Sequence, residues 1–247
     1  MNLLIILLVL LLIFAVLISF VLALKLIKQL PKLFQGGDSQ STILFIPGLG
    51  NGRESWNWNT ASDELINKMK IPRNSGIESP VSEFANVITF NPPGINNELS
   101  VPDSLDNYCK YIHSLTSEQT PYVVAHSIGC VIANRYAELY PTNKMLFLDP
   151  TPDFVLNDMS KPDFYTKSGG KYDITKKYID MIAGCTQRVS PSTRIIYNLD
   201  DNDPRKKLFK EYIENNYSNT LELKNKSHFI HLVEPKLVIE EIRKLII

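Results

Sequence analysis

Beyond residue 41, short runs of apolar residues alternate with longer segments in which apolar residues recur at helical spacing. The predicted strands are Thr42–Ile46, Val87–Phe90, Tyr122–Ala125, Met145–Leu148, Arg194–Tyr197 and Thr220–Leu223. The predicted helices are Ala61–Lys70, Asp103–Leu115, Cys130–Leu139, Ile174–Ile182, Pro204–Asn215 and Glu234–Ile246. Because continuous apolar runs are typical of strands buried on both faces, this alternation predicts an α/β fold with a mostly parallel sheet flanked by helices.

The N-terminal segment has a different pattern. From Leu3 to Leu24 the chain has no charged residue, no Gly and no Pro, and Ser19 is the only polar residue. Since about 20 apolar residues in a helix span the hydrocarbon core of a bilayer, we predict one transmembrane anchor at residues 1–24. A cleaved signal peptide ending near Val21-Leu22-Ala23 is the alternative, but the segment lacks a basic start and exceeds the usual length of a signal core.

The charges beside this segment predict its orientation. Lys25, Lys28 and Lys32 follow it, whereas only the α-amino group precedes it. Because basic residues tend to remain on the cytoplasmic side, we expect a single-pass membrane protein whose C-terminal domain lies in the cytoplasm. Two Asn-x-Ser sequons, at Asn216 and Asn225, provide a test, since both would be open to glycosylation in a lumenal domain.

Length and composition limit the rest of the chain. With 247 residues, the chain is long enough for one sizeable core, which we place at residues 42–247 after a linker at residues 25–41. The segment at about 150–193 reads as an insertion that forms a short cap. The 26 basic and 26 acidic residues balance, so no nucleic-acid partner is expected. The three cysteines lack the spacing of a metal site, so no metal is expected.

The strongest chemical signal is Ala125-His126-Ser127-Ile128-Gly129, which lies where a predicted strand turns directly into a predicted helix. A serine on such a turn presents its hydroxyl above the sheet edge, and small residues two positions before and after it let the backbone turn without clashes. The following helix offers its N-terminal amides to developing negative charge. The pattern predicts a nucleophile at Ser127; a serine that only caps the helix is the alternative.

From about residue 41 to its end, the chain resembles the α/β-hydrolase superfamily, in particular single-domain serine hydrolases with a short cap. The order of elements and the turn at Ser127 match the family, although Ala125 stands where Gly is usual. The resemblance implies an oxyanion hole formed by the backbone amides of Leu49 and Ile128. Leu49 lies in the loop Pro47-Gly48-Leu49-Gly50, in which Pro replaces a residue that is often His in the family.

The resemblance also implies an acid in the loop after Arg194–Tyr197. This loop contains Asp200, Asp201 and Asp203. Asp201 best fits the spacing of the family, and Asp200 and Asp203 remain open as alternatives.

The base follows from a late loop that resembles the family's His-containing segment before Glu-Pro and the final helix. His228 stands at the expected distance from Pro235. His126 adjoins the nucleophile and should point away from it, and His231 fits better as a residue that is packed at the helix entry or partly exposed. The expected triad is therefore Ser127, His228 and Asp201, in the chain order that this superfamily uses.

This triad implies a serine hydrolase that cleaves carboxylic esters through an acyl-enzyme, without a cofactor. We expect a small-molecule or lipid ester as substrate, because apolar residues of the cap would suit an acyl chain; they could equally serve only to pack the cap. A catalytically silent hydrolase fold that serves as a membrane-tethered binding or scaffold module is the main alternative. Amide, thioester or carbon–carbon hydrolysis by the same triad is another. The sequence does not determine the oligomeric state.

Overall fold

The computed structural model describes residues 40–96, 99–117, 119–159, 172–183 and 192–247. The predicted anchor at residues 1–24 and nearly all of the predicted linker at 25–41 lie outside these ranges, as does part of the predicted cap. No helix within the described ranges is long and apolar enough to cross a bilayer.

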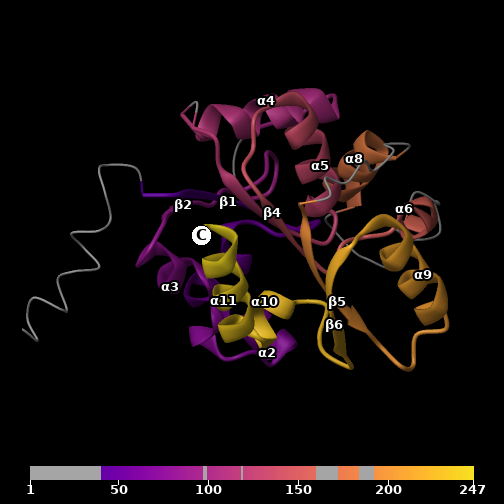
Figure 1. Cartoon of the computed structure of the whole chain (residues 1–247). Helices are drawn as coiled ribbons and strands as arrows, with labels where there is room; N and C mark the ends of the chain where they lie inside the picture. Colours follow the sequence, from indigo (N-terminus) through magenta and orange to yellow (C-terminus); the bar gives the residue numbers. More distant parts are fainter. Residues whose placement is uncertain (1–39, 97–98, 118, 160–171, 184–191) are drawn as a thin grey trace, which may run out of the picture. The chain divides into compact units, whose positions relative to one another are not determined.

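The described domain is built on one parallel sheet of six strands in the order β2-β1-β3-β4-β5-β6 (Figure 1). The strands are β1 (Thr42–Ile46), β2 (Asn86–Ile88), β3 (Tyr122–His126), β4 (Met145–Leu148), β5 (Arg194–Leu199) and β6 (Asn219–Lys224). Each overlaps a strand predicted from the sequence, so the parallel α/β architecture is confirmed. In β1, β3 and β4 the side chains are almost all buried, as expected for strands covered on both faces.

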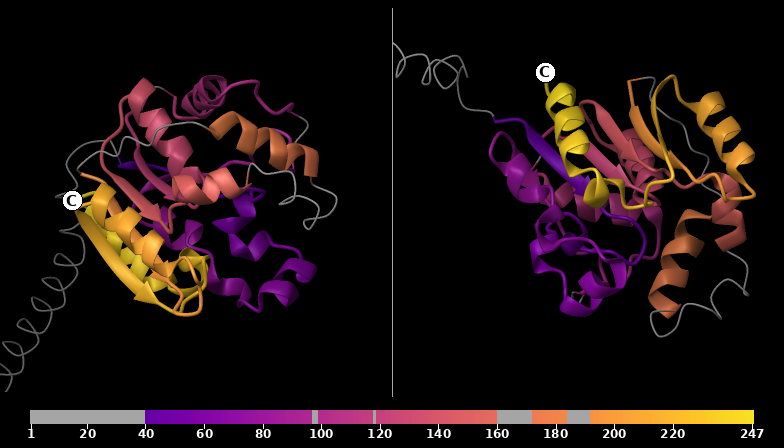
Figure 2. Two further views of the ribbon diagram at one scale, coloured as in Figure 1. Left: turned by 90° about the vertical axis from the view of Figure 1, so that its right-hand side faces the viewer. Right: turned by 90° about the horizontal axis from the view of Figure 1, so that it is seen from below.

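Helices cover both faces of the sheet (Figures 1 and 2). The helices that the sequence predicted are α2 (Asp63–Met69), α4 (Leu105–Leu115), α5 (Gly129–Leu139), α8 (Tyr172–Ile182), α9 (Lys206–Asn216) and α11 (Pro235–Leu245). Among the described residues the chain also forms α3 (Glu78–Ser82), α6 (Asp153–Met159) and α10 (Ile230–Val233), which the sequence pattern did not predict. α3 and α10 are too short to show a helical period, and α6 lies at the start of the segment that was interpreted only as a cap.

Two apolar cores lie on opposite faces of the sheet. One joins α4, α5, α8 and α9 to the sheet through residues such as Ile112, Val131 and Ile213. The other joins α3 and α11 to the sheet through residues such as Val81 and Ile242. The sheet is thus fixed on both sides, and its carboxyl edge carries the loops that follow β1, β3, β4 and β6.

The order of the strands in the sheet determines where a site can form. From β1 the chain continues to β2 on one side, whereas β3 pairs with β1 on the other. Loops diverge where the strand order reverses in this way, which leaves a crevice at the carboxyl ends of the strands. The register pairs Ile46 with Ala125, and His126 with Leu148. Residues that directly follow β1, β3 and β4 are therefore neighbours.

Candidate active site

Ser127 occupies the sharp turn predicted for it, directly after β3 and before α5. Its φ of 56° lies in the left-handed region, which a non-glycine residue adopts only at a cost of about 1–3 kcal/mol. The surrounding structure fixes this conformation, because the Ser127 amide donates to the carbonyl of Leu148 at 3.0 Å and its own carbonyl accepts from the Cys130 amide at 3.0 Å. Strained backbone held in this way is typical of a serine that must project its hydroxyl.

Glycines let the loop after β1 approach this turn. A Cβ added to Gly48 would lie 3.2 Å from Ser127 Cβ and 3.0 Å from His126 Nδ1. A Cβ added to Gly129 would lie 2.6 Å from the carbonyl oxygens of Ile46 and Pro47, closer than any side chain could fit. The loop that contains Leu49 therefore lies directly against the start of α5, whose N-cap is Ile128. Neither amide donates a hydrogen bond among the residues that the structure describes.

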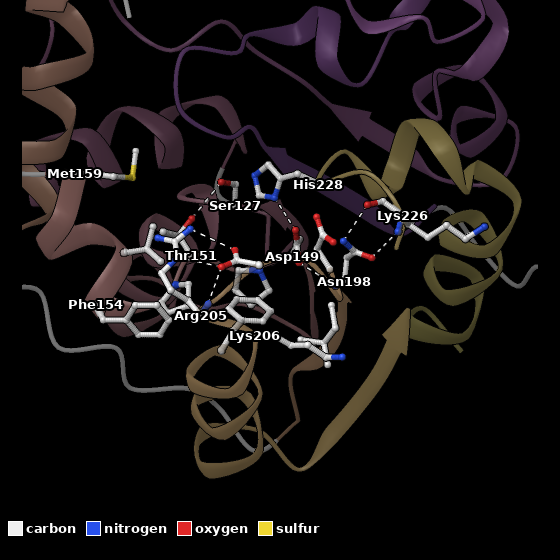
Figure 3. Close-up of a pocket in the computed structure, with 17 residues that line it drawn as sticks. Ser127, Asp149, Thr151, Phe154, Met159, Asn198, Arg205, Lys206, Lys226 and His228 are labelled. Carbon is white, nitrogen blue, oxygen red and sulfur yellow. Dashed lines mark hydrogen bonds and ion pairs between the residues drawn. The ribbon is translucent and has the colours of Figure 1, made fainter. Parts of the chain in front are cut away.

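His228 follows β6, and its ring reaches the same place. Its Nδ1 lies 2.5 Å from Asp149 Oδ2. In the view of Figure 3 the ring lies between Ser127 and Asp149. The structure thus brings Ser127 and His228 to one cavity, as the sequence indicated, but it supplies the carboxylate from Asp149, which directly follows β4.

The expectation that Asp201 orients His228 was therefore wrong. The carboxylate of Asp201 instead accepts hydrogen bonds from Lys206 and from Asn225. These bonds hold the pKa of Asp201 below its usual value. The two alternatives are not placed against His228 either, since Asp200 accepts from the Asn202 amide and Asp203 pairs with Arg205.

The reason for this correction is the path of the loop after β6. The loop turns back over the sheet edge until the carbonyl of His228 lies 2.9 Å from His126 Nε2, at the end of β3. Asp149 immediately follows the neighbouring strand, whereas Asp201 lies in the turn beyond β5, where its side chain is half exposed. The histidine is thus held above β3 and β4, away from the turn that carries Asp201.

Asp149 is firmly positioned. Its φ is 48°, its amide donates to the carbonyl of Ile196 at 2.7 Å, and its Oδ1 accepts from the Asn198 amide at 2.9 Å. Its side chain is 10% exposed, against 48% for His228. One carboxylate oxygen is therefore fixed by the backbone, and the other is directed at the imidazole. A carboxylate at the end of the buried strand next to the nucleophile's strand was the signal in the sequence that could have identified it.

In the structure the hydroxyl of Ser127 contacts Thr151. Its Oγ lies 3.1 Å from Thr151 Oγ1, and the Thr151 amide donates to the Ser127 carbonyl at 3.4 Å. Thr151 follows Asp149 by two positions, so the chain that supplies the carboxylate also contacts the nucleophile. Hydrogen bonds in unliganded sites often rearrange when a substrate binds, so a rotation of Ser127 towards His228 is compatible with this contact.

A cavity of about 440 Å³ opens beside these residues, within the range of small-molecule sites (Figure 3). One part of its wall is apolar and comprises Phe154, Val155, Met159, Leu199 and Phe209. Another part is charged and includes Arg205, Lys206 and Lys226 with Asp200 and Asp203. Because Lys206 and Arg205 are paired with aspartates and Lys226 with Glu234, the charges of this wall are largely compensated.

Other reactive groups are poor candidates for the chemistry. Cys130, three positions after Ser127, is fully buried, and burial raises the pKa of its thiol well above the usual value. Among the described residues, no group of three His, Cys, Asp or Glu side chains could hold a metal ion. Ser127, His228 and Asp149 line the same cavity, an arrangement that can support nucleophilic chemistry at a serine hydroxyl.

Comparison with known proteins identifies the fold. No protein-family model matches the sequence, and no curated protein sequence matches it. Solved structures with the same fold include a candidate lipase from Acinetobacter baumannii, with 19% identity, 85% of each chain covered and a TM-score of 0.56. Carboxylesterase CesB from Bacillus subtilis is 9% identical, with 85% of each chain covered and a TM-score of 0.52.

A third similar structure is an AqdC variant that recognises the Pseudomonas quinolone signal and cleaves its ring. It is 10% identical, covers 85% of this chain and 92% of its own, and gives a TM-score of 0.58. Identities this low show the fold alone. The chain has the α/β-hydrolase fold, which confirms the resemblance found in the sequence.

Proposed function

We propose that the protein is a serine hydrolase that cleaves carboxylic esters, with Ser127 as nucleophile, His228 as base and Asp149 as the acid that orients the base. The observation that carries this proposal is the 2.5 Å contact between His228 Nδ1 and Asp149 Oδ2 beside a serine held at a φ of 56°. A base and its orienting carboxylate beside a strained serine form the arrangement that acyl transfer requires.

The mechanism follows from these positions. His228 takes the proton of the Ser127 hydroxyl through Nε2, because Nδ1 is occupied by Asp149. The serine oxygen attacks the ester carbonyl, and the amides of Leu49 and Ile128 stabilise the oxyanion. His228 then returns the proton to the leaving alcohol, and water releases the acyl group by the same route in reverse. Asp149 stays ionised and stabilises the imidazolium in both halves of the cycle.

The cavity supports an ester with an extended apolar part. Phe154, Met159 and Phe209 line it beside Ser127, and apolar walls of this kind favour aliphatic or aromatic groups. Among the similar structures, one is described as a candidate lipase and one as a carboxylesterase. We therefore include lipid esters in the proposed substrate class.

We also propose that residues 1–24 anchor the enzyme in a membrane, with residues 42–247 on the cytoplasmic side. This part of the proposal rests on the uninterrupted apolar run from Leu3 to Leu24 and on the lysines that follow it. An anchor would place the cavity close to substrates dissolved in the bilayer.

The test is labelling of the full-length protein in detergent with a fluorophosphonate probe, which reacts with activated serines. We expect the wild type to be labelled and Ser127→Ala to be unlabelled, with His228→Ala strongly impaired because the serine loses its base. Hydrolysis of p-nitrophenyl esters of graded chain length should follow the same order. A folded wild-type protein that is not labelled would contradict the proposal and favour a binding module; labelling of Ser127→Ala would show that the nucleophile is another residue.

A further inference from the structure

His126 immediately precedes the nucleophile, yet its side chain belongs to the interior. It is 1% exposed, and its Nε2 lies 2.9 Å from the carbonyl oxygen of His228. The sequence indicated only that His126 points away from the site. The structure shows where it points: to the main chain of the residue that carries the proposed base.

The direction of this hydrogen bond follows from the chemistry of its two partners. A carbonyl oxygen only accepts a hydrogen bond, so Nε2 of His126 must carry the hydrogen and donate it. Burial lowers the pKa of His126 well below its usual value, and nearby His228 and His231 lower it further. The ring therefore remains neutral, with its hydrogen on Nε2, and acts as a constant donor.

The same ring packs against several residues of the loop after β6. Its centroid lies 4.6 Å from that of His228, 5.3 Å from that of Phe229 and 4.7 Å from that of His231. The ring centroid of His231 in turn lies 4.5 Å from that of Trp56, which is fully buried. One face of the loop thus packs against buried aromatic rings. The hydrogen bond from His126 Nε2 to the His228 carbonyl adds a directional contact to this packing.

The loop needs such support because His228 is half exposed. Asn198 holds the chain upstream through two hydrogen bonds with the backbone of Lys226, at 2.8 and 2.9 Å. Asp149 holds the side chain of His228. Among the described residues, His126 supplies the side-chain hydrogen bond to the main chain of His228 itself.

We propose that His126 is a positioning residue, which holds the main chain of His228 so that the imidazole stays aligned with Ser127. This inference rests on the proposed function. Because His126 and Ser127 are consecutive, the strand end that presents the nucleophile also fixes the distance to its base. A misplacement on the order of 1 Å can cost about 100-fold in rate, so such a link has a measurable effect.

The test compares His126→Gln with His126→Leu in the full-length protein. The Gln amide can donate to the His228 carbonyl from about the same position, whereas Leu fills the space without a donor. We expect His126→Leu to lower kcat for a p-nitrophenyl ester about 10- to 100-fold with KM unchanged, and His126→Gln to recover most of that loss. His113→Leu is the matched control, because His113 is a half-buried histidine on α4 that contacts Tyr136 at 3.3 Å; its kcat should not change.

A second measurement does not depend on activity. Hydrogen exchange of backbone amides in residues 227–233 should be faster in His126→Leu than in the wild type and near wild-type in His126→Gln. Equal kcat in folded His126→Leu and wild type would overturn the inference, and so would equal losses in the Leu and Gln variants, which would indicate packing alone. Faster exchange in His126→Leu, combined with a wild type that is not labelled at Ser127, would refute the proposed function but leave the structural link intact.

Discussion

At the scale of single residues, the site depends on two residues in unfavourable backbone conformations. Ser127 and Asp149 have φ values of 56° and 48°, and each directly follows a buried parallel strand. Each conformation costs about 1–3 kcal/mol unless neighbouring contacts compensate it. The compensation for Asp149 includes the hydrogen bonds of its amide and of its Oδ1. Both residues line the cavity, and the carboxylate of Asp149 contacts His228.

The role of Asp149 can be separated from that of Asp201 by matched substitutions. Asp149→Asn keeps an acceptor for the Asn198 amide but turns an NH₂ group towards His228, which selects the wrong imidazole tautomer. We expect kcat to fall on the order of 10³- to 10⁴-fold. Asp201→Asn should leave kcat unchanged, because Asp201 contacts Lys206 and Asn225 at the surface. Steady-state kinetics with a p-nitrophenyl ester would measure kcat of both variants. A larger loss of kcat in Asp201→Asn than in Asp149→Asn would identify Asp201 as the acid.

At the scale of elements, α11 is joined to the sheet by a charged contact as well as by its apolar face. Glu241 of α11 accepts from Arg194 of β5 at 3.0 Å and from Lys244 at 2.9 Å. Its side chain is only 8% exposed. Burial alone would raise the pKa of Glu241, but the hydrogen bonds from Lys244 and Arg194 outweigh it and the pKa is lowered. The ionised carboxylate is therefore the form that the folded protein favours.

This contact predicts a stability that depends on pH. Glu241→Gln should lower the free energy of unfolding at pH 7 by about 1.5–3 kcal/mol, the range of hydrogen bonds to charged groups. Because the folded-state pKa is lowered, the contribution of Glu241 is fully present above its unfolded pKa of about 4.3 and is lost as the pH falls through the lower folded-state pKa. Urea unfolding of the wild type and the variant at pH 7 and at a series of pH values below about 4 would show whether their free energies of unfolding converge.

The control for this experiment is Glu240→Gln. Glu240 is 63% exposed and pairs only with Lys244 among its described neighbours, so its removal should have no measurable effect. An equal loss in both variants would show that the charge of the helix, and not the buried contact with Arg194, stabilises α11.

At the scale of the whole molecule, residues 40–247 form one compact unit. Strands, site and both apolar cores belong to this unit, so folding and catalysis should not require the N-terminal segment. The proposed anchor would then determine only where the enzyme works.

Deletion of residues 1–39 tests this separation. We expect the shortened protein to move from the membrane pellet to the supernatant and to keep its Ser127-dependent kcat on a water-soluble ester. Sedimentation and kinetics of the two forms would measure these effects. Retention of the shortened protein in the pellet would contradict the anchor. Glycosylation of full-length protein at both Asn216 and Asn225, which are exposed, would contradict the cytoplasmic side.

The sequence by itself determined the features that depend on local order. Continuous apolar runs predicted the strands, and the strand-to-helix junction predicted the sharp turn at Ser127, because both are patterns of adjacent residues. His228 was found by its place before Pro235 in the family pattern. The helices α3 and α10 were missed because a helix of about one turn leaves no period to detect, and α6 was missed because its segment was interpreted only as a cap.

Only the tertiary structure decided which carboxylate meets His228 and where His126 points. Asp149 and Asp201 both follow parallel strands, and the sequence gives no measure of how far the loop after β6 turns back across the sheet edge. That distance is set by the contact of His126 with the His228 carbonyl and by the packing of His231 on Trp56, which join residues far apart in the chain. Long-range packing of this kind has no local signature. The nucleophile was therefore predicted from its own turn, whereas the choice between the carboxylates after β4 and β5 depended on the tertiary structure.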